Sequence, residues 1–98
     1  MNLAEVLKAV KEEHLNLNQL EDYSFALTNL YADMQLALAE VRKKKALYFV
    51  EHPEKTVAGT GIKWSASTDG LREIDLSHQC RATEKVLSSL KSRIYRSL

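Results

Sequence analysis

Cysteine, proline and glycine are scarce in this chain, and each shortage excludes a class of protein. The single cysteine, Cys80, rules out a disulfide framework and a structural zinc site built on cysteines. One proline and three glycines are too few for an all-β domain with many turns. No apolar run is long enough to cross a membrane, and the N-terminus lacks the apolar segment of a secretory signal peptide. We therefore expect a cytoplasmic protein with no membrane partner.

The residues that are present favour one small folded domain over residues 1–98. Hydrophobic residues make up 45% of the chain and charged residues 28%, which is typical of globular rather than disordered proteins. The net charge of +1 conceals an uneven distribution, because residues 1–41 carry a net −5 and residues 42–98 a net +6. Such a split indicates an acidic partner for the basic half, self-association between opposite halves, or attraction between the halves of one molecule.

Helical periodicity predicts a short helix over residues 2–14 and a long one over residues 19–52. Asn18 followed by Glu21 indicates a capping box at the start of the long helix, and Pro53 indicates its end. The long helix carries a heptad seam on one side. The seam comprises Leu20, Tyr23, Leu27, Leu30, Met34, Ala37, Val41 and Tyr48.

A second apolar line runs along the opposite side of the same helix. One helix with two apolar lines requires two partners, so we expect the first helix to cover part of this line and another subunit to cover the rest. Three large residues, Phe25, Leu36 and Leu47, are the candidates for an oligomer interface. The full line comprises Phe25, Ala32, Leu36, Leu47 and Val50.

Residues 53–68 contain the only proline and two of the three glycines, which predicts a loop, with a small β-ribbon around Gly59–Gly61. The last helix is predicted over residues 69–97, with Asp69 as its N-cap. Two long helices joined by a loop predict an all-α fold in which a short N-terminal helix precedes a long antiparallel, coiled-coil-like hairpin. Because so thin a domain buries little surface, we expect a homo-oligomer. The seam of the last helix comprises Leu76, Cys80, Thr83, Leu87, Leu90 and Ile94.

No set of residues suggests catalysis, so we expect a non-enzymatic protein without a cofactor. The three histidines, His14, His52 and His78, lie far apart and show no metal-ligand spacing. Cys80 falls on a core seam, where a thiol is a poor nucleophile. The two glycines of the predicted loop lack the spacing of a phosphate-binding loop.

The last helix presents basic side chains on the side opposite its seam. Alternating basic and small hydroxyl residues suit a row of phosphates, and an adjacent aromatic ring can stack on an unpaired base. The alternative is an ordinary solvated face, although such faces usually mix charges of both signs. The candidate nucleic-acid-binding residues on this helix are Arg81, Lys85, Arg93, Arg96 and Tyr95, with Ser88 and Ser92 between them.

A second basic cluster, Arg42-Lys43-Lys44-Lys45, surrounds the end of the long helix instead of forming one face. Lys45 falls on the apolar side of the helix. The predicted loop adds Lys55, Lys63 and Trp64. Trp64 has two interpretations, because an indole in a loop can stack on exposed bases or cap the hydrophobic core of the hairpin.

The segment Ala-Glu-Val-Arg-Lys-Lys-Lys-Ala-Leu-Tyr-Phe (39–49), a lysine-bearing loop and a closing basic helix ending Leu-Lys-Ser-Arg-Ile-Tyr-Arg-Ser-Leu (90–98) resemble small helical proteins of bacteriophages. In particular, residues 20–98 are similar to the recombination mediators of T-even-type phages. Those proteins are helical hairpins that oligomerise into rings, bind single-stranded DNA and help to load a recombinase. The resemblance implies DNA contacts by Lys43, Lys44 and Lys45, and a location in the cytoplasm of the host cell.

Three functions follow as hypotheses. The first is an oligomeric accessory protein that binds single-stranded nucleic acid, with DNA and RNA both open because no base-reading motif is present. The second is an adaptor or inhibitor that presents a helical face to a larger protein partner. The third is a structural assembly unit in which acidic and basic halves of different subunits pair.

Overall fold

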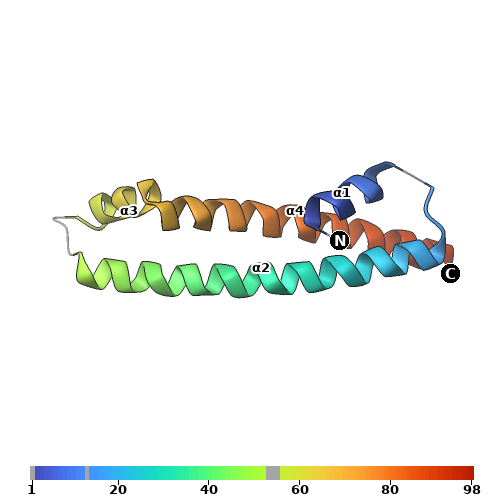
Figure 1. Cartoon of the computed structure of the whole chain (residues 1–98), viewed down its shortest axis with the longest axis horizontal. Coiled ribbons are helices and arrows are strands. Elements are labelled where there is room, and N and C mark those ends of the chain that lie inside the picture. The colour runs from blue at the N-terminus through green and yellow to red at the C-terminus, as the bar shows by residue number, and fades with distance from the viewer. Residues whose placement is uncertain (1, 13, 53–55) are drawn as a thin grey trace. The chain divides into compact units, whose positions relative to one another are not determined.

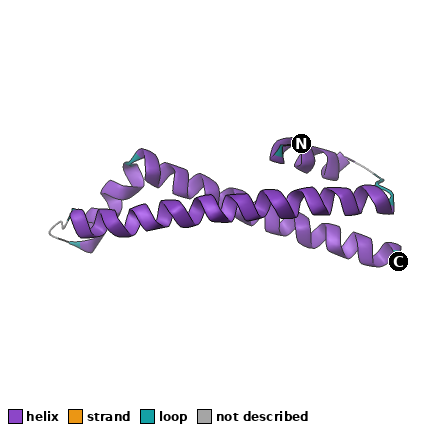
Figure 2. Cartoon of the chain, turned by 60° about the horizontal axis from the view of Figure 1, so that its bottom comes forward, coloured by secondary structure: helices purple, strands orange, loops and turns teal. Residues whose placement is uncertain are grey.

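The computed structural model describes residues 2–12, 14–52 and 56–98, and every regular element in these ranges is an α-helix (Figures 1 and 2). The helices are α1 (Leu3–Glu12), α2 (Leu17–Glu51), α3 (Val57–Ala66) and α4 (Thr68–Ser97). The all-α class is confirmed, and α2 packs against α4 as the two arms of the predicted hairpin. The chain divides into two compact units.

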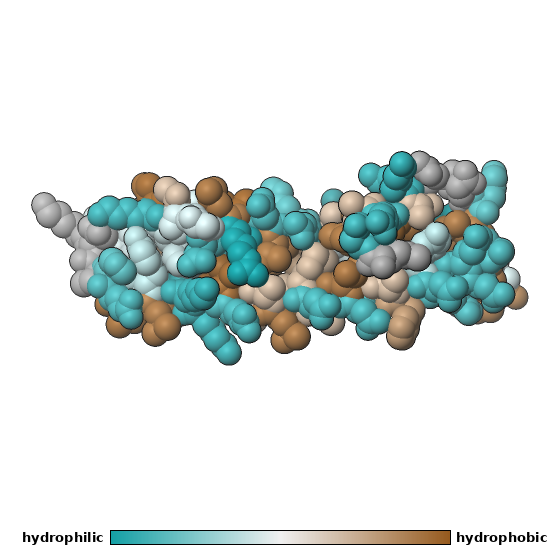
Figure 3. Space-filling view, in the orientation of Figure 1, coloured by the Kyte–Doolittle hydropathy of each residue, from teal (hydrophilic) through white to brown (hydrophobic). Residues whose placement is uncertain are grey.

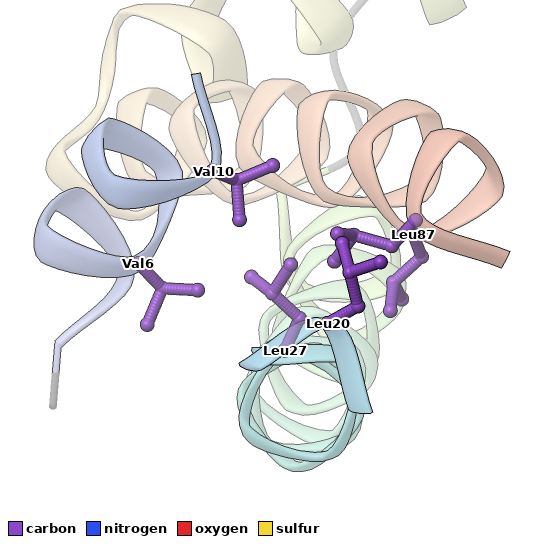
Figure 4. Close-up of a cluster of buried hydrophobic side chains, with 6 residues drawn as sticks. Val6, Val10, Leu20, Leu27 and Leu87 are labelled. Carbon is purple, nitrogen blue, oxygen red and sulfur yellow. The ribbon is translucent and has the colours of Figure 1, made fainter. Parts of the chain in front are cut away.

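Unit 1 comprises Met1–Asp33 and Cys80–Leu98, so it contains α1, the beginning of α2 and the end of α4. Side chains from all three helices meet in its core, as Figure 4 shows. The predicted seam positions of both long helices are buried or partly buried, with Leu27 of α2 and Leu90 of α4 each fully inaccessible to solvent. The core residues of unit 1 are Val6, Val10, Leu20, Leu27, Leu87 and Leu90.

Unit 2 comprises Met34–Gln79 and contains the remainder of α2, all of α3 and the beginning of α4. Among the described residues of unit 2, four side chains are at most 7% exposed: Leu38 and Val41 from α2, and Thr60 and Trp64 from α3. The hydroxyl of Thr60 donates to the carbonyl of Thr56 at 3.3 Å, so its burial leaves no polar group without a partner.

Reciprocal side-chain caps begin the first two helices. At α1, the Asn2 carboxamide accepts from the Glu5 amide at 2.8 Å, and the Glu5 carboxylate reaches back to the Asn2 amide. At α2, Asn16 and Gln19 form the same pair at 2.9 and 3.0 Å. The predicted capping box at Asn18 is therefore wrong by two residues. Asn16 and Asn18 each have a side chain suited to a capping box three positions later, Gln19 and Glu21. The helix begins after Asn16, which includes Leu17 in its first turn.

The predicted loop over residues 53–68, with its β-ribbon at Gly59–Gly61, is wrong for most of its length. Val57–Ala66 form α3, whose first turn is capped by the Thr56 hydroxyl accepting from the Gly59 amide at 3.0 Å. Each of the two glycines costs about 1 kcal/mol in a helix relative to alanine. Burial of the Trp64 side chain within unit 2 outweighs this cost. The predicted helix stop at Pro53 lies outside the described residues, although α2 does end two residues before it.

Ser67 both ends α3 and begins α4. Its amide donates to the Trp64 carbonyl at 2.9 Å, and its hydroxyl accepts from the Gly70 amide at 3.0 Å. The N-cap predicted at Asp69 is therefore displaced to Ser67. The close turn requires glycine at position 70, because a Cβ there would lie 1.8 Å from the Trp64 carbonyl oxygen.

α1 does not cover the second apolar line of α2. It packs through Val6 and Val10 onto the seam side of the helix, in the core of unit 1 (Figure 4). Phe25, which belongs to the second line, remains 72% exposed. The prediction that α1 covers part of that line is wrong, because α1 completes the core that α2 and α4 form.

Candidate nucleic-acid interface

The basic side chains predicted on the last helix lie at the surface of α4 in unit 1. Arg81, Lys85 and Arg96 are exposed, and the buried Leu87 and Leu90 on the other side of the helix hold this face outward. Two exposed serines occupy positions between the cations. We call this surface the α4 basic face: Arg81, Lys85, Ser88, Ser92 and Arg96.

An aromatic ring stands at the C-terminal end of the α4 basic face. The Tyr95 side chain is 81% exposed, and with Lys91, Ser92 and Arg96 it lines a shallow hollow. The arrangement places an accessible ring beside two cations and a hydroxyl, which are the groups that bind a base and its phosphate.

Arg93 has a structural contact that distinguishes it from its neighbours. Its side chain is only partly exposed, and its Nη1 atom donates to the Val10 carbonyl oxygen of α1 at 3.3 Å. A cation near the carbonyl end of a helix also interacts favourably with the helix dipole. Arg93 therefore fastens α1 to α4 and is not part of the exposed row of cations.

Glu84 is the one acidic residue between Leu76 and Leu98, and it bonds to a neighbouring helix. Its carboxylate accepts a hydrogen bond from the Tyr31 hydroxyl of α2 in unit 1. This hydrogen bond, partial desolvation of the phenol and the negative charge of Glu84 raise the pKa of Tyr31 to about 12. The carboxylate is thereby directed toward α2, at the margin of the α4 basic face.

The second basic cluster is organised around Glu73 of α4 in unit 2. Its carboxylate lies 3.3 Å from Lys45 Nζ and 3.7 Å from Arg42 Nε, and it accepts from Trp64 Nε1 at 3.1 Å. Burial alone would raise the pKa of Glu73, but the hydrogen bonds from Trp64 and Lys45 and the two positive charges hold it below its ordinary value. Lys45, for which the resemblance implied a DNA contact, therefore has an ion-pair partner within unit 2.

Trp64 caps the core of unit 2, which is one of the two interpretations that the sequence left open. It is 3% exposed, and its ring lies 5.5 Å from that of Tyr48 at a tilt of 56°. A buried indole offers no free face to a nucleobase, so stacking on DNA by Trp64 is incompatible with this structure. The sequence could not decide between the interpretations because the partner of the indole, Glu73, belongs to another helix.

The remaining lysines of the predicted site are in unit 2 or outside the described residues. Lys43 and Lys44 are exposed on α2, and Lys63 is exposed on α3. Lys55 lies outside the described residues. The structure therefore brings the cations of the α4 basic face together in one unit, and Lys43, Lys44 and Lys63 in the other.

Large apolar side chains are exposed on all three helices of unit 2, and Figure 3 shows apolar surface over both α2 and α3. Two of them, Leu36 and Leu47, were predicted as interface residues and are 68% and 59% exposed. Those of α3 were missed because its segment was interpreted as a loop, so no helical face was considered there. The further exposed apolar residues of unit 2 are Val50, Val57, Ile62, Leu71 and Ile74.

Two other classes of site are not found among the described residues. These residues contain no group of three or more His, Cys, Asp or Glu side chains placed to hold a metal ion. None of the helices in the described ranges is sufficiently long and apolar to span a bilayer.

Comparisons with known proteins provide no relative from which a site could be transferred. The chain matches no protein-family model, no curated protein and no solved structure in these comparisons. Any proposal for its function therefore rests on its own residues.

Proposed function

We propose that the protein is a non-enzymatic accessory protein that binds single-stranded nucleic acid through the α4 basic face. The observation that carries this proposal is the exposure of Arg81, Lys85 and Arg96 on one side of one helix, with serines between them. Lysine and arginine attract phosphates, and serine adds hydrogen bonds without hindering their approach.

Tyr95 supports a single-stranded ligand in preference to a duplex. Its exposed ring can stack on an unpaired base, whereas the bases of a duplex already stack on one another. A resemblance to phage recombination mediators is in keeping with this ligand and would place the binding in DNA recombination. Within the proposal, Arg81, Lys85 and Arg96 hold phosphates and Tyr95 stacks on a base.

The test is fluorescence anisotropy with a labelled single-stranded oligonucleotide at several salt concentrations. Three phosphate contacts predict that log K falls with log salt at a slope of about −2. The double variant Arg81→Glu/Lys85→Glu removes two of these contacts, so we expect at least about tenfold weaker binding and a shallower slope. Far-UV circular dichroism should show unchanged helicity, because both side chains are exposed.

Lys8→Glu/Lys11→Glu is the matched control. Both lysines are exposed on α1 in the same unit, so the control changes the net charge by the same amount but spares the α4 basic face. We expect it to retain most of the affinity. Equal losses in the two double variants, or no loss in Arg81→Glu/Lys85→Glu, would contradict the proposal.

A second candidate function is that of an adaptor or inhibitor which binds a larger protein. The specific observation is the exposed apolar surface of unit 2, since monomeric proteins rarely expose large contiguous apolar patches. Ile62 of α3 is 71% exposed and Leu71 of α4 is 55% exposed. Loss of partner binding in Ile62→Asp, with nucleic-acid binding unchanged, would separate this function from the first.

A further inference from the structure

Four exposed side chains form one line on α2 within unit 2. Leu36, Glu40, Lys43 and Leu47 follow one another at spacings of four, three and four residues, which places them on one side of a helix. Leu36 and Leu47 are 68% and 59% exposed, and Glu40 and Lys43 between them are exposed as well. We call these four residues the α2 line.

The α2 line is symmetric about its midpoint, except that an acidic residue on one side corresponds to a basic residue on the other. Reading from either end gives a leucine, two oppositely charged residues and a leucine. In a two-fold symmetric pair, a contact from residue i to residue j implies the contact from j to i. An antiparallel pair centred between Glu40 and Lys43 therefore places each Leu36 against Leu47 of the second copy, and each Glu40 against Lys43.

We propose that the α2 line binds the α2 line of a second copy of this chain in antiparallel orientation. Burial of the four leucines supplies the attraction, because each side chain removes apolar surface from water. The two Glu40–Lys43 pairs set the orientation, since exposed ion pairs add little affinity but like charges placed opposite one another oppose association. A parallel, in-register pair would place Glu40 against Glu40 and Lys43 against Lys43.

The self-complementary charge order favours a second copy over an unrelated partner. An unrelated protein would need its own leucine, acid, base and leucine at matching spacings, whereas a second copy supplies them without further requirement. Glu40 and Lys43 are also available for such a contact, because neither has an ion pair with another described residue. This self-association is independent of nucleic-acid binding, which uses the α4 basic face of unit 1.

Charge exchange tests the proposal by sedimentation equilibrium over a wide range of protein concentrations. Glu40→Lys and Lys43→Glu each place like charges opposite one another, so we expect each to raise the dimer dissociation constant at least about tenfold. Combining them in Glu40→Lys/Lys43→Glu exchanges the charges within both pairs and should restore the wild-type constant. Leu36→Asp should raise the constant further, while circular dichroism confirms that the helices persist.

Two cysteine variants test the orientation under mild oxidation. An antiparallel pair brings position 36 of one copy close to position 47 of the other. A mixture of Leu36→Cys and Leu47→Cys should therefore form a crosslinked heterodimer, and neither variant alone should crosslink. The wild-type chain, whose Cys80 is buried, is the control for unrelated disulfides.

Three outcomes would overturn the proposal. The first is a wild-type chain that remains monomeric at every concentration. The second is an oligomer whose dissociation constant is unaffected by Glu40→Lys and Leu36→Asp, since the contact would then use another surface. The third is efficient crosslinking of Leu36→Cys alone, which would indicate a parallel pair.

Discussion

At the scale of single residues, close contact with the end of α3 requires glycine at position 70. The first turn of α4 approaches the end of α3 so closely that a Cβ at position 70 would meet three backbone atoms, Trp64 carbonyl oxygen at 1.8 Å first among them. Backbone atoms cannot rotate away as a side chain can. Glycine is therefore required by close approach, since its φ is not positive.

Gly70→Ala should destabilise the protein by about 1–3 kcal/mol, because the methyl group forces α3 and α4 apart. Gly61→Ala is the control, since its Cβ would find only Phe49 Cζ at 3.9 Å. There, the gain in helix propensity should stabilise the fold by about 0.5–1 kcal/mol. Urea unfolding followed by circular dichroism measures both, and equal effects of the two substitutions would contradict this explanation.

Glu73 is the acidic partner that Arg42 and Lys45 share in unit 2. Glu73→Gln keeps an oxygen for the Trp64 indole but removes the partner of Lys45 and Arg42, so we expect a loss of about 1–2 kcal/mol at pH 7. Because folding lowers the pKa of Glu73, its contribution is complete above the ordinary glutamate value of about 4.3 and disappears as the pH falls through the lowered pKa. The stability difference between wild type and Glu73→Gln should therefore shrink in acid. A difference that is the same at neutral and acidic pH would contradict the assigned role.

At the scale of helices, heptad spacing predicted α2 and α4 and many of the residues that they bury, although it missed the buried Leu38. Leu27 and Leu90 are buried as their seams require. α3 was not predictable in this way, because Gly59 and Gly61 have the local preferences of a loop. The contacts that favour the helix are tertiary: Trp64 is buried beside Tyr48 of α2 and donates to Glu73 of α4. Local propensity fails where a tertiary contact decides the conformation.

The candidate site shows the same division between local and tertiary information. Spacing correctly placed Arg81, Lys85 and Arg96 at the surface of α4, because exposure follows from the position opposite a buried seam. The roles of Arg93 and Lys45 depend on Val10 and Glu73, which are distant in sequence, so periodicity could not reveal them. The spacing of apolar residues predicts which side chains are exposed, but it does not predict which of them contact residues that are distant in sequence.

α1 is a helix whose stability depends on docking. Ten residues form too few turns to be stable alone in water, so α1 depends on its apolar contacts and on the hydrogen bond from Arg93 to Val10. Arg93→Gln should cost about 1 kcal/mol and increase amide hydrogen exchange in α1 more than elsewhere in unit 1. Arg96→Gln removes an exposed charge one turn from this contact and should leave exchange in α1 unchanged. Equal exchange in the two variants would contradict the role of Arg93.

At the scale of the whole molecule, acidic and basic parts of the sequence are combined within unit 1. Met1–Asp33 belong to the acidic half of the chain and Cys80–Leu98 to the basic half, and the fold brings the two segments together. Unit 1 therefore combines two segments of opposite net charge. Arg81, Lys85 and Arg96 of α4 are exposed in this unit and are available to an external anion.

The burial of Trp64 has a spectroscopic consequence. It is the only tryptophan in the chain, and its indole is enclosed in unit 2 beside Tyr48 and Glu73. Selectively excited indole emission therefore monitors the integrity of unit 2, whereas the far-ultraviolet circular dichroism signal sums the helices of both units. The natural chain already contains the probe needed to ask whether its two units melt together or one after the other.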